Sequence, residues 1–369
     1  MKYKVDSTSL TAIADAIRGK TGGTAELEFP DEFVSEIENI GGGDSEYWTR
    51  PSDWPNLDSI SFTDFEGYYL TYKLDEVTET AQWISLLATT DSGDYIVERG
   101  HLLNGSFVSD FTQTVTRNQA FKQQLNPQDG NIQLWRVIPD TGHLTSGGVF
   151  QARETDGYTF PIGFQPCVEQ YSKGEYLTST NMNNPTVVIT GTARLGHVTY
   201  FLQHDRIIGT TNFTNLGMMW HGCPSLKLID FDNASFPNVT SLAQLFTLGS
   251  LPKKVDFSGA DLSNVTNMQL AFNNNGIEYL DFSTVGNNVT TFSRILEGNY
   301  SLKEVYPCAI GASLPFTTAQ RLSANSVNRI IAALKQVSEA LTITFDAGVK
   351  AALTQEQVAT ITGKGWTIA

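Results

Sequence analysis

The sequence repeats itself every 24 to 26 residues between about residue 204 and residue 306, and this repeat constrains the fold more than any single motif. In each copy an Asn precedes an apolar residue, and further apolar residues follow three and seven positions later. An alternating strand pattern comes next, so strands are expected at 226–231, 254–257, 278–282 and 302–306. A unit this short cannot bury its own apolar face, so the copies must stack around a shared core. The repeat therefore predicts a solenoid, which commonly binds ligands along an extended face.

Composition narrows the classes of function. The chain has 369 residues, enough for two or three domains, and its net charge of −15 argues against binding to nucleic acid. No apolar run approaches the roughly 18 residues of a membrane span, so no membrane insertion is expected. The first residues lead into a polar helix instead of an apolar signal-peptide core, so we expect synthesis in a cytoplasm without a signal peptide. The chain is rich in Gly, Phe and Tyr with 17% charged residues, which favours a mainly β fold with short helices.

Four segments follow one another along the chain. Residues 1–43 predict two short helices and a Gly-rich linker; because these helices cannot bury both of their apolar stripes, we expect residues 1–40 to self-associate or to dock on another protein. Residues 44–170 show short strands and turns that predict a β-sandwich-like domain, with possible carbohydrate binding. Residues 171–310 are assigned to the solenoid, and the looser pattern of 311–369 predicts a C-terminal cap over its open end.

The start of the second segment is unusually aromatic. Trp48 and Trp54 lie close to Arg50 and Asp53, and three tyrosines follow at Tyr68, Tyr69 and Tyr72. Flat rings of this kind can stack on the C–H face of a sugar, and the charged neighbours can supply orienting hydrogen bonds. The alternative is that the rings fill the core of the domain. Both interpretations stay open at this stage.

One acidic position recurs in the repeats. Asp230, Asp256 and Asp281 occupy the same place in successive strands and should form a column along one face. Such a column could bind a cation or a hydroxylated ligand. It could equally accept hydrogen bonds from turn amides or remain exposed.

Motifs for catalysis or cofactor binding are not found. The five His residues show no His-x-x-x-His spacing, and neither a Gly-x-Ser-x-Gly elbow nor a phosphate-binding Gly-rich loop occurs. The three Cys residues (Cys167, Cys223 and Cys308) lack metal spacing. No cofactor, metal or catalytic residue is therefore predicted, although a pair of carboxylates for glycoside hydrolysis could be hidden in any sequence.

Both ends of the chain and the repeats resemble known proteins. Residues 5–6, 10–18, 20–22 and 29–33 resemble the opening of tail proteins from phages and prophages of Gram-positive bacteria, and 353–369 resembles the close of proteins from the same setting. The repeats resemble the atypical leucine-rich repeats of bacterial surface proteins and phage adhesins. The first copy departs from that pattern, because it has Phe213 where the others have Val.

The resemblance implies a virion tail protein, made in the host cytoplasm, that binds a polysaccharide or protein of the bacterial surface. It also implies a homo-oligomer, with a trimer favoured, that assembles through residues 1–40 and contacts other tail proteins. Two alternatives remain, a tail-associated glycan hydrolase and an inert structural spacer.

Overall fold

The computed structural model describes residues 47–57, 67–74, 83–149, 167–173, 179–180, 202–217, 219–220, 226–246, 252–273 and 276–369. The chain divides into two compact units, 1–49 and 50–369, and the fold described below belongs to the second. The helices expected in 1–43 lie outside the described residues. Within the described part of the chain, none of the helices has the length and apolar character needed to cross a membrane.

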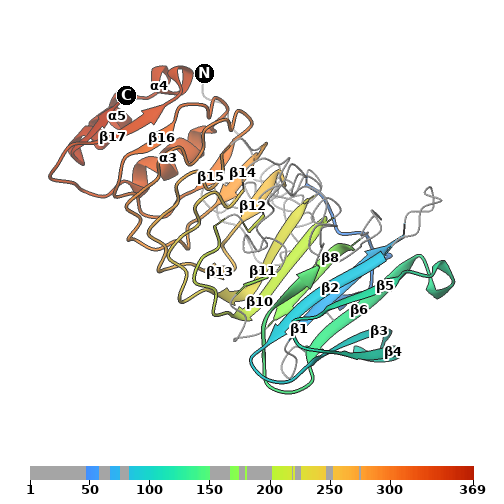
Figure 1. Ribbon diagram of the computed structural model, residues 1–369. Coiled ribbons are helices and arrows are strands. Elements are labelled where there is room, and N and C mark those ends of the chain that lie inside the picture. The colour runs from blue at the N-terminus through green and yellow to red at the C-terminus, as the bar shows by residue number, and fades with distance from the viewer. Residues whose placement is uncertain are drawn as a thin grey trace, which may run out of the picture. The chain divides into compact units, whose positions relative to one another are not determined.

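The expectation of a mainly β chain with short helices is confirmed (Figure 1). Among the described residues, nine strands precede residue 200, namely β1 (Gly67–Lys73), β2 (Trp83–Thr90), β3 (Tyr95–Leu103), β4 (Ser106–Val115), β5 (Ala120–Gln124), β6 (Ile132–Pro139), β7 (Leu144–Val149), β8 (Cys167–Lys173) and β9 (Ser179–Thr180). A 3-10 turn, η2 (Pro127–Asp129), precedes β6. Nine strands follow, namely β10 (His204–Thr210), β11 (Leu228–Ser235), β12 (Lys254–Asp256), β13 (Ala260–Asp261), β14 (Tyr279–Asp281), β15 (Glu304–Tyr306), β16 (Leu314–Phe316), β17 (Leu341–Phe345) and β18 (Trp366–Ile368). The helices are α3 (Ala324–Ala333), α4 (Ala347–Ala351) and α5 (Gln355–Gly363).

Two sheets pack together in the first part of this unit. Strands β8, β1, β6, β3 and β4 are antiparallel neighbours in one sheet, and β5, β2, β7 and β9 form the other. Side chains from both sheets share one core. The ring of Phe121 on β5 lies 5.9 Å from Trp135 on β6 and 6.3 Å from Phe111 on β4, measured between centroids.

The first sheet does not stop where the sequence pattern changes. Strand β8 pairs antiparallel with β1 on one edge and parallel with β10 on the other, so a single sheet runs in the order β13-β11-β10-β8-β1-β6-β3-β4. A domain boundary expected between residues 170 and 171 therefore falls inside β8. One hydrophobic core also runs from Tyr68 to Trp366.

The second part consists of turns in which each repeat pairs with the next. Strands β10 and β11 are parallel, as are β12, β14 and β15 (Figure 1). A second line of parallel pairs joins β11 to β13 and Leu262 to Val285, and a third joins Ser241, Asn267 and Thr291. Residues 202–369 are called the stacked turns below. Trp220, Phe246 and Phe272 stack in their core, with centroids 5.0 and 5.9 Å apart for successive pairs.

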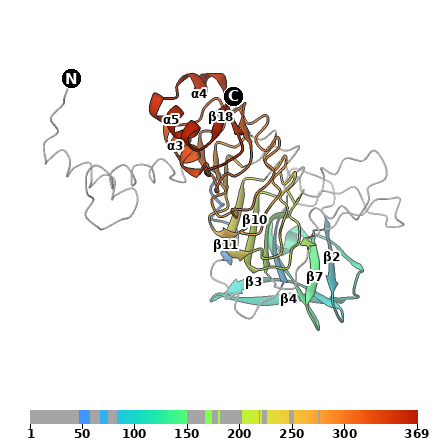
Figure 2. The ribbon, with the colours of Figure 1, turned by 90° about the vertical axis from the view of Figure 1, so that its left-hand side faces the viewer.

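The pairing also continues beyond Tyr306. Ile310 pairs with Leu334, and β16, β17 and β18 form a parallel three-stranded sheet that ends at Ile368. Helix α3, capped by the Ser323 side chain, packs on β15, and α5 packs on β18 (Figure 2). The repeat was expected to loosen after residue 306. Instead, helices occupy part of each turn while the parallel strands persist, so 311–369 continues the stack.

Candidate functional site

Alternation along the strands separates a core side from an outer side. Ile229, Val255, Leu280 and Val305 are buried in the large core, so their neighbours on β11, β12, β14 and β15 point to the other side of the sheet. We call this side, continued across β10, β8, β1, β6 and β3, the outer face. Each position on it is identified through the register of the paired strands.

One row of side chains crosses the outer face from strand to strand. Register pairs join Glu98 to Arg136, Arg136 to Tyr69, Tyr69 to Tyr171, Tyr171 to Arg206, and Arg206 to Asp230. Asp256, Asp281 and Tyr306 continue the row by the same criterion. Phe231 and Phe257 lie 5.2 Å apart between ring centroids, which places Asp230 and Asp256 at equivalent positions in their turns. The predicted aspartate column and part of the predicted aromatic cluster therefore share one face.

A buried carboxylate lies at the junction of the antiparallel and parallel strands. Glu169 is fully buried, and its Oε1 and Oε2 accept hydrogen bonds from Arg50 at 2.5 and 2.7 Å. Thr71 Oγ1 donates to Oε2 at 3.0 Å, and His204 Nδ1 lies 2.8 Å from Oε1. Burial alone would raise the pKa of Glu169, but the hydrogen bonds from Arg50 and His204 outweigh it and hold the pKa below its usual value. These contacts make Glu169 the anchor for Arg50.

The segment 50–57, which we call the strap, lies on the outer face at this junction. Arg50 Nη2 donates to the Pro55 carbonyl at 2.6 Å, and its guanidinium lies 5.5 Å from the centre of the Trp54 ring. Leu57 is buried in a small cluster with Tyr69, Leu134, Tyr171 and Ile208. The strap therefore covers the middle of the outer face.

Most rings of the predicted aromatic stacking platform are buried in this arrangement. Trp54 of the strap and Tyr69 of the small cluster are only 3% and 2% exposed. Tyr68 and Tyr72 point the other way, into the large core. Alternation on β1 places these two tyrosines and Tyr69 on opposite sides of the strand, and both sides are covered. Trp48 is partly exposed and Asp53 is exposed.

The structure explains the partners of the aspartate column. Asp230 lies 3.6 Å from Arg206, and its side chain is 46% exposed. Asp256 Oδ1 accepts a hydrogen bond from the Ser258 amide at 2.9 Å, and Asp281 Oδ1 accepts one from the Ser283 amide at 2.9 Å. Burial raises the pKa of Asp281, and the Asp256 carboxylate raises it further. The hydrogen bonds from Ser283 lower the pKa but do not cancel this rise. Turn amides thus hold two members of the column.

Aromatic and charged side chains surround the far end of the column. The Tyr279 and Tyr306 rings lie 5.3 Å apart, with Lys254 Nζ 5.2 Å from the centre of the first and the Arg329 guanidinium 3.9 Å from the centre of the second. Lys254 Nζ also lies 3.4 Å from Asp256, and Arg329 forms an ion pair with Glu304. This end of the outer face combines rings, carboxylates and cations.

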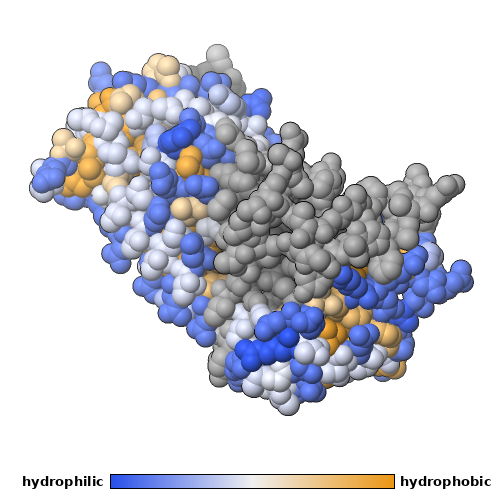
Figure 3. All heavy atoms as spheres, viewed as in Figure 1, coloured by the Kyte–Doolittle hydropathy of each residue, from blue (hydrophilic) through white to orange (hydrophobic). Residues whose placement is uncertain are grey.

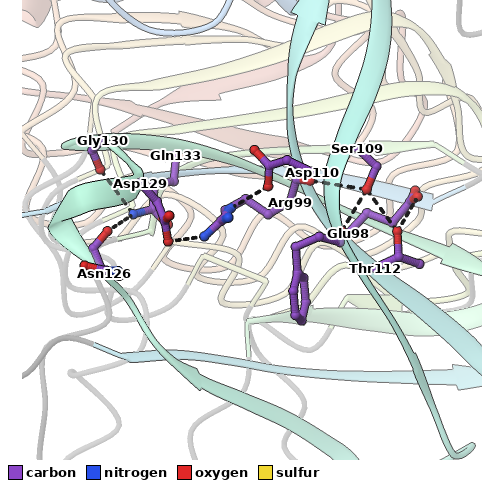
Figure 4. Close-up of polar contacts among 10 residues, drawn as sticks. Glu98, Arg99, Ser109, Asp110, Thr112, Asn126, Asp129, Gly130 and Gln133 are labelled. Atoms are coloured by element: carbon purple, nitrogen blue, oxygen red, sulfur yellow. Dashed lines mark hydrogen bonds and ion pairs between the residues drawn. The ribbon is translucent and has the colours of Figure 1, made fainter.

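A polar cluster near the opposite edge was not predicted. Arg99 on β3 donates to Asp110 on β4 at 2.8 Å and to Asp129 of η2, so it joins three elements (Figure 4). Arg99 lies at a β-bulge, where the register between β3 and β4 shifts. Its guanidinium donates to one side chain of the neighbouring strand and to one of the 3-10 turn. The cluster therefore stabilises the β3–β4 edge.

Sequence reasoning singled out Arg50 but missed its partner Glu169 and the neighbouring His204, because no local spacing marks them. Glu169 and His204 are 35 residues apart, and Arg50 and Glu169 are 119 apart. Among the described residues, no group of three or more His, Cys, Asp or Glu side chains is placed to hold a metal ion. Comparison with known protein families, with curated proteins and with solved structures finds no match.

Proposed function

We propose that the protein is a tail-tip or tail-fibre protein of a phage or prophage of Gram-positive bacteria, and that it recognises the host cell surface. The observation that carries the proposal is the outer face, where one row of charged and aromatic side chains crosses successive strands. An extended surface of this kind suits weak, repeated contacts with a polymeric cell wall. Several linked copies would then gain avidity without a tight single site. The likeness of 1–40 and 353–369 to phage tail proteins supports the same conclusion.

We assign the parts of the chain as follows. The two packed sheets correspond to a β-sandwich-like module, and the stacked turns to a solenoid of the leucine-rich-repeat kind. The last helical turns, with α3 and α5, close its open end as a cap. The binding surface is the outer face, and no residue of it is assigned a catalytic role.

Residues 1–40 act in this proposal as an anchor that assembles the protein, as a trimer, onto other tail proteins in the virion. Their two apolar stripes need a partner, since so small a segment cannot bury both. Light scattering of the full chain and of a variant lacking residues 1–43 tests this assignment. An unchanged stoichiometry would place the interface elsewhere.

Adsorption to cells tests the main proposal. The full-length protein, fluorescently labelled, is mixed with a panel of Gram-positive species and sedimented with the cells. Binding to one or a few species is expected, without release of reducing sugar from their walls. Sugar release would favour a tail-associated glycan hydrolase, and binding to none of the species would favour a structural spacer.

A further inference from the structure

The distal part of the outer face differs from the part beneath the strap. It comprises Lys254, Asp256, Tyr279, Asp281, Tyr306 and Arg329, which we call the Tyr–Asp patch. The Lys254 and Asp256 side chains are 28% and 27% exposed, and Arg329 is 23% exposed. Both tyrosines are partly exposed. These five side chains are therefore reachable by a ligand, whereas Asp281 is only 7% exposed and Tyr69 and Tyr171 are buried.

The two rings of the patch are held in place before any ligand arrives. They come from neighbouring strands, β14 and β15, whose register places Tyr279 beside Glu304 and Asp281 beside Tyr306. Lys254 and Arg329 pack against them through cation–π contacts. Arg329 is itself fixed, since its Nε donates to the Val305 carbonyl at 3.0 Å. A rigid aromatic surface binds at a low cost in conformational entropy.

Hydrogen-bonding groups lie beside the rings. The turn amides of Ser258 and Ser283 use one oxygen of each carboxylate, Oδ1 of Asp256 and Oδ1 of Asp281. A carboxylate has about four acceptor positions, so Asp256, whose side chain is 27% exposed, keeps acceptor capacity toward a ligand. Burial raises the pKa of Tyr279, and Asp256 and Asp281 raise it further, so its hydroxyl keeps its proton and can donate.

The charge of the patch selects between classes of polymer. Its two cations are already matched by carboxylates, Lys254 by Asp256 and Arg329 by Glu304. Asp281 adds a carboxylate beyond these pairs, so an approaching phosphate would meet a surface without a spare cation. Like-charge contact suppresses binding of the wrong partner. A phosphate-rich polymer is therefore a poor fit.

We propose that the Tyr–Asp patch binds an uncharged, hydroxyl-rich sugar chain, which packs on Tyr279 and Tyr306 while Asp256 accepts its hydroxyl groups. This inference rests on the proposed function and specifies the ligand class. It places the contact on the stacked turns and not on the two packed sheets.

Purified cell walls provide the probe. Walls from the species bound in the adsorption assay are used intact and after hydrofluoric acid treatment, which removes phosphodiester-linked polymers. Full-length wild type, Tyr306→Ala and Asp256→Asn are compared by sedimentation. Tyr300→Ala and Asp261→Asn are the matched controls. Tyr300 is a 58% exposed ring outside the patch, and Asp261 accepts the Ser263 amide at 3.0 Å in the same kind of turn on another side of the stack.

Wild-type protein and both controls should bind treated walls as well as intact ones, and each patch variant should bind at least tenfold more weakly with an unchanged melting temperature. Loss of wild-type binding after acid treatment would overturn the sugar assignment and leave the proposed function standing. Equal binding by patch variants and controls would place the contact elsewhere, again without harming the proposed function. If wild type binds no wall at all, both proposals fail together.

Discussion

At the residue scale, Asp205 is the most unusual group in the core. It is fully buried, and its Oδ2 accepts a hydrogen bond from Trp220 Nε1 at 2.8 Å. Its Oδ1 has no hydrogen-bond partner among the described residues. Burial raises the pKa of Asp205 to about 6 from 3.8, although the Trp220 bond and His204 act in the opposite direction. Asp205 therefore favours the folded state only when it is protonated.

The raised pKa of Asp205 makes the stability of the folded protein depend on pH. Because the folded pKa lies above the unfolded one, folding is not penalised below about pH 3.8, and stability falls as the pH rises through about 6. A shift of roughly two pKa units corresponds to about 3 kcal/mol. Asp205→Asn keeps an acceptor for Trp220 and removes the charge. It should raise the free energy of unfolding by up to about 3 kcal/mol at pH 7.5 and change it little at pH 4.

Urea unfolding of wild type and Asp205→Asn at both pH values measures this difference, and contributions from other groups cancel between the two proteins. Asp230→Asn is the control, because Asp230 is largely exposed and its pair with Arg206 is long. The control should change stability by less than about 1 kcal/mol at either pH. An Asp205→Asn protein that is less stable than wild type at pH 7.5 would contradict the account.

At the element scale, the stacked turns depend on contacts between successive copies. Phe272 is fully buried, and its ring centre lies 5.9 Å from Phe246, 6.1 Å from Phe257 and 6.2 Å from Phe282. Truncating a buried Phe typically costs about 3–5 kcal/mol. Because stability in stacked repeats passes through nearest-neighbour interfaces, Phe272→Ala should also loosen the turns on either side.

Hydrogen exchange of Phe272→Ala should show lost protection that spreads from residue 264 into about 238–290. Tyr300→Ala, at an exposed ring, should leave the same amides protected. If protection is lost at residue 272 alone, the turns are not energetically coupled.

The repeat pattern predicted the strands of the stacked turns. Those expected at 254–257, 278–282 and 302–306 correspond to β12, β14 and β15. The recurring Asn side chains join neighbouring turns: Asn238 Nδ2 donates to Asn212 Oδ1 of the previous turn at 3.2 Å, and Asn264 Nδ2 donates to the Pro237 carbonyl at 2.8 Å, and both bonds are exposed. Each Asn precedes a buried apolar residue and so points outward, which agrees with the mostly polar surface of the turns (Figure 3).

At the scale of the whole molecule, the pairing between distant segments escaped prediction. A strand's own pattern shows which side is buried but not which strand lies beside it. Nothing in residues 167–173 indicates that β8 pairs with β1 on one edge and with β10 on the other. The aspartate column was predictable because it repeats locally, whereas the contacts of Glu169 depend on three segments that meet only in the folded chain.

Because one sheet runs across residues 170 and 171, the two parts of the chain should unfold together. Separate domains at 44–170 and 171–369 would unfold in two transitions, whereas a chain in which one sheet and the large core span that boundary should unfold in one. Cutting between residues 170 and 171 would divide β8, deprive β10 of a neighbour and leave Tyr69 and Ile207 without part of their packing.

We expect a single calorimetric transition for the full chain. We also expect each of the two fragments to lack a cooperative transition when made alone and to bind the dye ANS. Two fragments that each unfold cooperatively would show that β8 is a seam between independent domains, and the strap at Arg50 and Glu169 would then be the contact that holds them together.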